Sequence, residues 1–205
     1  MNALEDAPSD QRTTPNRPDL VDWQGVLPPF ADHLAAATER ARQLRIGEPW
    51  SLAIDQSRLG DDPYRRDVVA LAAAWRNRRK TSTVYVFAYD HPVPSSVLDP
   101  IVDDAQEACL AQGTPRAFAQ REGRADSRCL YVGHALRFDG RLREHLGDGA
   151  RKTSALNLKH WALFPDGPLM LQAYAFADSD VPLARLFEEY LLDTLHPVLG
   201  RRGGR

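Results

Sequence analysis

The chain has 205 residues, of which 43% are apolar and 26% charged, and its formal net charge is −2. These values exclude a peptide, a large multidomain machine and a wholly disordered, collagen-like or disulfide-rich chain. No run approaches the roughly 20 apolar residues that span a bilayer, and the amino terminus is polar and acidic where a signal peptide is basic and then apolar. We therefore expect a cytoplasmic globular protein that does not enter a membrane.

The amino-terminal part is predicted to lie outside the main domain. Residues 1–18 hold three prolines and many small polar side chains without periodicity, so we expect a disordered tail. Apolar side chains at helical spacing predict helices over 29–45 and 64–78, with a short strand, Trp50–Ile54, between them. Because helices dominate this part, we expect residues 19–80 to form an amino-terminal helical lobe.

From residue 81 onwards, strands alternate with helices. The predicted order is a strand over 83–89, a loop over 91–94, a helix over 95–112, an irregular segment over 113–127 and a strand over 128–133. Ser95 or Ser96 would cap the helix.

The remaining part of the chain is predicted to hold two helices and a hairpin. A helix over 138–146 ends at Gly147, extended segments over 155–164 and 169–177 flank the turn Pro165-Asp-Gly, and a final helix covers 182–196. Two cysteines, Cys109 and Cys129, are too few for a disulfide framework and match no metal-ligand spacing.

Five residues stand in an order that suggests chemistry. They are Tyr85 in the motif Thr83-Val-Tyr, Tyr131 in the motif Tyr-Val-Gly133, Arg141 and His145 on the following helix, and Glu188 on the last helix. This ordered set resembles the GIY-YIG nuclease family, over most of residues 83–200. In that family an arginine lies eight residues beyond the second glycine, often with a histidine four further on, and the last helix carries a metal-binding glutamate followed by two aliphatic residues and a proline.

The sequence departs from the family pattern in four places. Thr83 replaces a glycine, Gly200 stands near a usual asparagine, and His134 holds a position often given to lysine or a small polar residue. The two tyrosine motifs are also far apart, where the family usually has a short hairpin. We treat residues from about 91 to 127 as a helical insertion into a nuclease-like domain that covers residues 81–205.

The resemblance implies an α+β fold, with a small, mainly antiparallel sheet flanked by helices. It also implies a metal-dependent endonuclease that hydrolyses phosphodiester bonds, with DNA as the expected substrate. Tyr85 or Tyr131 would activate water, and Arg141 would neutralise the phosphate. His145 would bind phosphate or assist proton transfer, and Glu188 would hold Mg²⁺ or Mn²⁺.

The residues themselves leave ordinary explanations open. Arg141 and His145 share one helical face at i and i+4, but most such pairs are surface residues. Tyrosines in strands are usually part of the core. On the last helix Glu188 falls at the margin of the apolar stripe and Glu189 outside it, so Glu188 is expected to be half-buried and to meet either an arginine or a metal ion.

The middle of the chain is its basic part. Residues 116–160 carry ten basic and five acidic side chains, although solvated protein surfaces often show the same excess. We expect six residues to contact nucleic acid: Arg121, Arg124, His134, Arg137, Lys152 and Lys159. If both DNA strands are cut, a homodimer is one arrangement that would achieve it.

Two alternatives remain open at this point. The chain could be a degenerate GIY-YIG-like module that binds nucleic acid without cutting it, or a non-catalytic interaction protein in which the spacing is coincidence. The nuclease hypothesis predicts that the five residues line one concave surface, with Glu188 and Arg141 on the same side of the sheet. The interaction-protein hypothesis predicts dispersed side chains and a Glu188 paired with an arginine.

Overall fold

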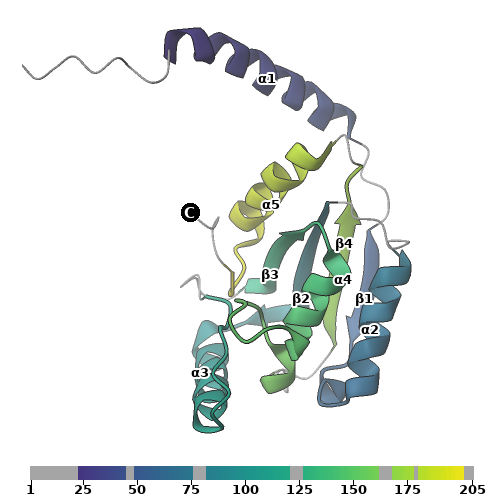
Figure 1. The fold of residues 1–205 in the computed structure, drawn as a ribbon, viewed down its shortest axis with the longest axis vertical. Helices are drawn as coiled ribbons and strands as arrows, with labels where there is room; N and C mark the ends of the chain where they lie inside the picture. The colour runs from purple at the N-terminus through teal and green to yellow at the C-terminus, as the bar shows by residue number, and fades with distance from the viewer. Residues whose placement is uncertain are drawn as a thin grey trace, which may run out of the picture. The chain divides into compact units, whose positions relative to one another are not determined.

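The computed structural model describes residues 23–44, 49–75, 82–120, 127–161, 168–177 and 180–200. The chain divides into two units, and the boundary between them along the sequence lies between Gln43 and Leu44. The first unit contains helix α1 (Trp23–Gln43; Figure 1). The side chains of Phe30 and Leu34 on this helix are exposed. The tail predicted over 1–18 lies outside the described residues. Within the described part of the chain, no helix is both long and apolar enough to cross a membrane.

The second unit is built on a four-stranded antiparallel sheet. Its strands, in the order β1-β4-β2-β3, are β1 (Trp50–Ile54), β4 (Leu169–Ala175), β2 (Thr83–Val93) and β3 (Ser127–Ala135). Four helices accompany the sheet: α2 (Asp62–Trp75), α3 (Ser95–Ala111), α4 (Phe138–Arg143) and α5 (Val181–Leu195). The predicted α+β class with a small antiparallel sheet is confirmed at this level.

Residues 50–75 belong to the sheet-bearing unit and not to an amino-terminal lobe. Strand β1 pairs with β4 from Trp50↔Ala173 onwards. Trp75 at the end of α2 stacks on Trp50 with ring centroids 5.4 Å apart, and both rings meet the edge of Phe138. The boundary therefore lies after Gln43, not near residue 80, because β1 completes its hydrogen bonds with a strand that is distant in the sequence.

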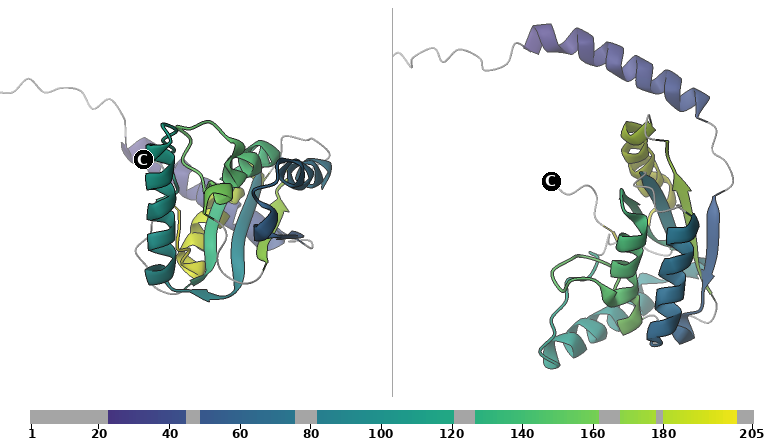
Figure 2. Two further views of the ribbon diagram at one scale, coloured as in Figure 1. Left: turned by 90° about the horizontal axis from the view of Figure 1, so that it is seen from below. Right: turned by 45° about the vertical axis from the view of Figure 1, so that its right-hand side comes forward.

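The strands have two different faces because successive side chains point to opposite sides. Tyr85 and Phe87 belong to the main core, which α2, α3 and α4 supply with residues that include Val68, Ala72, Leu98, Val102, Phe138 and Leu142. Val86 lies on the other face and packs with Val132 and the α5 residues Leu191 and Leu192. Helices α4 and α5 are therefore on opposite faces of the sheet, and Figure 2 gives two further views of them.

Strands β2 and β3 pair directly, although α3 and the segment after it separate them in sequence. The register runs from Thr83↔Ala135 to Phe87↔Tyr131, and a β-bulge follows Phe87. The inserted helix thus leaves the pairing of the two tyrosine motifs intact. It also leaves β3 at the edge of the sheet.

Three local predictions were wrong. Strand β2 continues to Val93 through the segment predicted as a loop, and Pro94, not Ser95 or Ser96, is the N-cap of α3. The hairpin predicted around residue 165 is absent from the described residues: 158–160 form a 3-10 turn (η3), and β4 pairs with β1 and β2 instead. The left-handed backbone of Asn157 (φ 54°) interrupts the extended path, while the turn Pro165-Asp-Gly lies outside the described residues.

Candidate functional site

The two motif tyrosines meet over a glycine on the face covered by α4. Tyr85 lies opposite Gly133 in the β2–β3 ladder, and the rings of Tyr85 and Tyr131 stack with centroids 6.1 Å apart. A Cβ atom at position 133 would lie 2.6 Å from both the Tyr85 hydroxyl oxygen and Cε1 of Tyr131. The glycine of the second motif is therefore a steric requirement for this tyrosine pair.

Buried His145 positions the hydroxyl group of Tyr85. The distance from Tyr85 Oη to His145 Nε2 is 2.9 Å, and the backbone N–H of Leu156 donates to His145 Nδ1 at 3.1 Å. Because Nδ1 accepts a hydrogen bond, the proton of the neutral ring is on Nε2, and the imidazole donates to Tyr85. Burial, reinforced by the charge of Arg141, holds the pKa of His145 well below its ordinary value. His145 is therefore a neutral donor at neutral pH.

His145 owes its position to a change in helix geometry. Helix α4 ends at Arg143 and continues as a π-helical turn, η2 (Glu144–Asp148). Gly147 has φ 103°, and a Cβ there would lie 2.6 Å from Cγ of Lys159. The predicted helix stop at Gly147 thus coincides with the π-helical turn. This turn places the His145 side chain in the core, where it has 0% exposure.

Arg141 links the tyrosine pair to the surface. Its Nη2 donates to the carbonyl oxygen of Ser154 at 2.9 Å and approaches Tyr131 Oη at 3.4 Å. Its Nη1 donates to Glu144 Oε2 at 2.7 Å. With 22% of its side chain exposed, Arg141 stands between the buried hydroxyls and solvent.

The side chain of Tyr85 is a neutral phenol. Burial, followed by the negative charge that Tyr131 would carry, raises the pKa of Tyr85 well above its ordinary value, and Arg141 opposes this rise. Tyr85 is 1% exposed, whereas Tyr131 is half-buried. Of the two hydroxyl groups, Tyr131 is therefore in the better position to meet water or a ligand.

Glu188 is carried by the helix that covers the opposite face of the sheet from the helix of Arg141, contrary to the expectation that both lie on one side. It lies on α5, and its carboxylate accepts a hydrogen bond from the backbone N–H of His134 on the edge strand β3. Burial raises the pKa of Glu188, and the positive charges of Arg185 and Arg141 oppose the rise. The expected single surface thus brings together Tyr85, Tyr131, Arg141 and His145, while Glu188 stands at the edge of β3.

Glu188 is the one predicted metal ligand. No group of three or more His, Cys, Asp or Glu side chains that could hold a metal ion occurs among the described residues. Among the described residues no ion pair includes Glu188, although the positive charges of Arg185 and Arg141 act on this half-buried carboxylate. Such a carboxylate fits a Mg²⁺ ion that keeps several waters and takes further ligands from phosphate, and does not fit a structural metal site.

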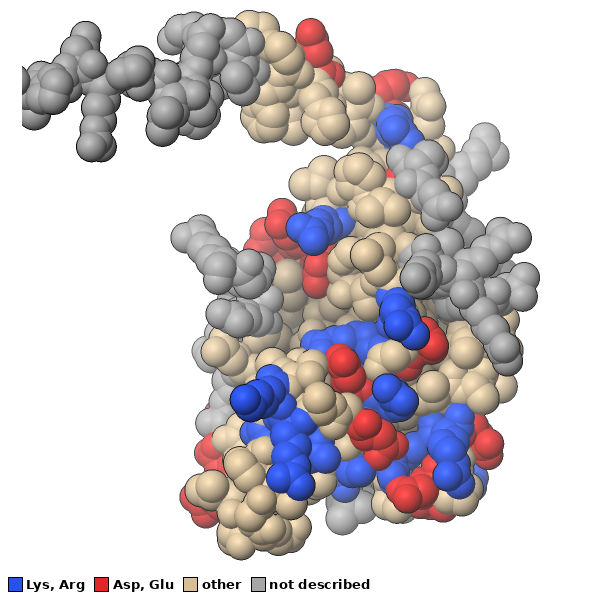
Figure 3. Space-filling model, in the orientation of Figure 1, with Lys and Arg blue, Asp and Glu red and all other residues tan. Residues whose placement is uncertain are grey.

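The predicted phosphate-binding residues fall into four groups. Arg137 and Lys152 are exposed, whereas Lys159 donates to Asp148 at 2.7 Å and is already paired. His134 is half-buried beside the hydroxyl of Ser82, and burial, together with Arg185, lowers its pKa. Arg121 and Arg124 lie outside the described residues. Figure 3 shows basic side chains gathered below the middle of the view with acidic ones between them, so this face is mixed in charge.

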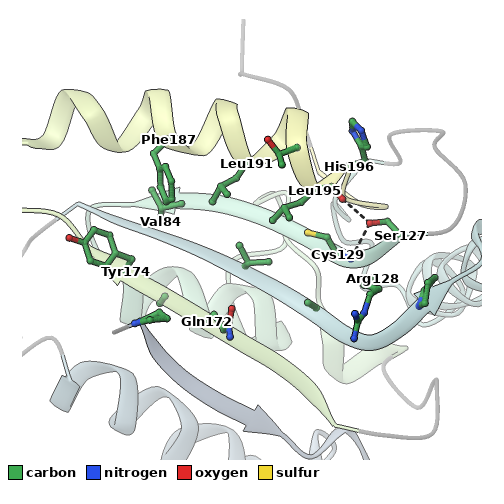
Figure 4. A pocket seen from close by; sticks show the side chains of 16 residues that line it. Val84, Ser127, Arg128, Cys129, Gln172, Tyr174, Phe187, Leu191, Leu195 and His196 are labelled. Carbon is green, nitrogen blue, oxygen red and sulfur yellow. Dashed lines mark hydrogen bonds between the residues drawn. The ribbon is translucent and has the colours of Figure 1, made fainter. Parts of the chain in front are cut away.

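The opposite face of the sheet has a pocket. A pocket of about 700 Å³ lies between α5 and the sheet, where Figure 4 shows Val84, Phe187 and Leu191 on its wall. Burial raises the pKa of the Cys129 thiol at this pocket to about 12. The thiol is therefore a protonated, weakly nucleophilic group.

Sequence reasoning missed three contacts of the site. The carboxylate of Glu144, the carbonyl of Ser154 and the backbone N–H of Leu156 fix Arg141 and His145. Only Glu144 left a signal, because it stands three residues after Arg141 on the same helix. Backbone carbonyl and N–H groups are common to nearly all residue types, so the partners at Ser154 and Leu156 leave no signal in the sequence.

Comparison with protein-family models, curated proteins and solved structures finds no match for this chain.

Proposed function

We propose that the protein is a metal-dependent endonuclease of the GIY-YIG type that hydrolyses phosphodiester bonds in DNA. One observation carries the proposal. Tyr85, Tyr131, Arg141 and His145 were selected from the resemblance to the family's motifs and offsets, and they form one contact network at the β2–β3 ladder. Coincidental matches to a motif would not be expected to converge in space.

The geometry suggests a separate role for each residue. Tyr131 orients the attacking water, because its hydroxyl is the more accessible one and receives an N–H group of Arg141 that stabilises negative charge on the oxygen. Tyr85 and the neutral His145 support Tyr131 from behind. Arg141 neutralises the charge that develops on the phosphate oxygens.

Glu188 would hold the metal ion. When bound, Mg²⁺ would supply a positive charge that stabilises the departing oxygen. Glu188 accepts a hydrogen bond from the backbone N–H of His134, so a metal ion that it holds would lie at the β3 edge of the sheet. Arg137 and Lys152, both exposed, would attract the phosphate backbone without regard to its sequence.

The direct test is incubation of the full chain with supercoiled plasmid and with single-stranded DNA, with and without Mg²⁺. We expect nicked and linear plasmid only with the metal ion. Arg141→Ala serves as the matched inactive variant, and its thermal melt must resemble that of the wild type. Cleavage that persists in this variant or in EDTA would refute the proposal.

A second candidate function is supported by a different observation. The helix that carries Glu188 lies on the opposite face of the sheet from α4, and Arg141 is already paired with Glu144. Both facts favour a degenerate module that binds nucleic acid and does not cut it. Binding of the plasmid without Mg²⁺-dependent cleavage would select this alternative.

A further inference from the structure

Glu144 occupies the position next to Arg141 where a negatively charged ligand would bind. Its Oε2 lies 2.7 Å from Arg141 Nη1, and 30% of the Glu144 side chain is exposed. The other terminal nitrogen, Nη2, contacts the Ser154 carbonyl and Tyr131 Oη. In the described part of the chain, Glu144 is the anionic partner of Arg141.

A phosphate and Glu144 compete for the same donors. A guanidinium group binds phosphate most strongly through two parallel N–H groups. Nη1 already donates to Glu144 and Nη2 to Ser154, so a phosphate that binds across the Nη1–Nη2 edge of Arg141 competes with an existing partner. Of these partners, the Glu144 carboxylate is the one with a negative charge, and a phosphate oxygen can take its place at Arg141.

The chain is shaped to keep Glu144 in this place. A Cβ atom at Gly149 would lie 2.7 Å from Cγ and 2.9 Å from Cα of Glu144. Gly149 has φ −88°, a value that any residue adopts, so the space taken by Glu144, and not the backbone conformation, calls for glycine. Glycine at position 149 therefore leaves the space that Glu144 fills while it contacts Arg141.

We propose that Glu144 is an internal anion that occupies Arg141 in the free protein and is displaced by a phosphate group of the substrate. Its effect is to weaken the binding of any isolated phosphate, so that only a ligand with several phosphate contacts, such as a polynucleotide, gains access to Arg141. The inference rests on the proposed function where it names a polynucleotide. The competition between carboxylate and phosphate does not depend on cleavage.

The first experiment measures the competition with inorganic phosphate. The Nε–H signal of Arg141, assigned by its loss in Arg141→Lys, is followed by NMR while phosphate is added to wild type, Glu144→Gln and Asp139→Asn. Glu144→Gln removes the competing charge, so we expect its phosphate affinity to rise about tenfold. Asp139→Asn removes one charge from the same helix without touching Arg141, and we expect a change of less than about twofold.

A second variant changes the geometry and keeps the charge. Gly149→Ala pushes Glu144 away from its present position, so it should raise phosphate affinity in the same direction as Glu144→Gln. In an Arg141→Gln background, the affinity of the protein for duplex DNA in EDTA should no longer respond to Glu144→Gln, because the competition needs Arg141. Thermal melts establish that each variant is folded.

The outcomes separate this proposal from the nuclease proposal. Equal phosphate affinity of wild type and Glu144→Gln, or a gain that survives without Arg141, would overturn the internal anion. Tighter phosphate binding by a protein that never cleaves DNA would support the internal anion and refute the nuclease. If the wild type cleaves DNA but the Glu144→Gln variant binds phosphate no better, the nuclease proposal would be supported and the internal anion refuted.

Discussion

The two faces of the sheet are made by the same strands but differ in how their polar groups are used. On the face covered by α4, Tyr85 bonds to His145, and His145 bonds to the backbone at Leu156. On the face covered by α5, apolar side chains line a pocket. The polar group of interest on α5, Glu188, is bound through the backbone of β3.

This difference follows from where charge can be accommodated. The α4 face is dense, and its buried hydroxyl and imidazole groups bond to one another and to the main chain, which removes most of the cost of burying them. On the other helix, α5, Glu188 bonds to the backbone N–H of His134 at the edge of the sheet. If the protein cuts DNA, its chemistry has to combine groups from both faces across the edge strand β3.

The largest expected effect is on the α4 face. Arg141→Lys keeps the charge but loses the planar fork that contacts Tyr131 and Ser154 together, so we expect DNA cleavage to fall about a hundredfold or more. Single-turnover rates with Mg²⁺ and plasmid measure it. Arg143→Lys on the exposed side of the same helix is the control and should cleave at the wild-type rate.

Glu188→Gln tests whether the α5 face takes part at all. The substitution keeps the side chain's size but removes the charge that would hold Mg²⁺, so we expect cleavage to fall at least about tenfold while DNA binding in EDTA survives. Glu189→Gln, on the exposed side of α5, is the matched control. Equal rates for a folded Glu188→Gln and wild type would confine the active site to the α4 face.

Local pattern predicted neighbouring side chains better than it predicted the sheet. The family's offset from Gly133 selected Arg141 and His145, and both lie against the motif tyrosines because both belong to the helical segment that follows β3. Strand Trp50–Ile54 was predicted at the observed bounds, yet its pairing with β4 was not, since composition does not report which distant strand completes a ladder.

The placement of Glu188 shows the same limit. Its helical angle predicted a half-buried residue, and it is half-buried. The angle refers to the helix alone, however, and does not say which face of the sheet that helix covers. The π-helical turn at Glu144–Asp148 was also outside prediction, because it depends on Gly147 lying against Lys159, a contact made only in the folded chain.

A third prediction concerns the packing that makes the α4 face dense. Gly133→Ala places a methyl group against Tyr85 and Tyr131, so we expect it to lower the free energy of unfolding by about 1–3 kcal/mol. Urea denaturation measures the loss. Gly60→Ala, where no atom lies within 4 Å of the added carbon, is the control for the substitution itself. Equal stability of the two variants would mean that the tyrosines can move apart freely.

The smallest expected effect is the pH dependence of stability that buried His145 imposes. Its folded-state pKa lies well below the ordinary value because of burial first and Arg141 second, so the unfolded chain binds a proton that the folded chain excludes. Its contribution is complete above the unfolded pKa of about 6.5 and is lost as the pH falls below that value, by up to about 1.4 kcal/mol per pH unit. His145→Asn retains an acceptor for the Leu156 N–H and cannot titrate, so its unfolding free energy should fall less steeply between about pH 6.5 and pH 5.

The comparison requires a histidine that is not buried. His91→Asn, at an exposed position on β2, should leave the pH dependence as in the wild type. Urea midpoints for the three proteins, measured at each pH, provide the slopes. If His145→Asn and wild type lose stability in parallel, then His145 is protonated without cost in the folded protein. That result would contradict the assignment of His145 as a neutral donor to Tyr85. It would also mean that the α4 face tolerates a buried charge as readily as the edge of β3 does.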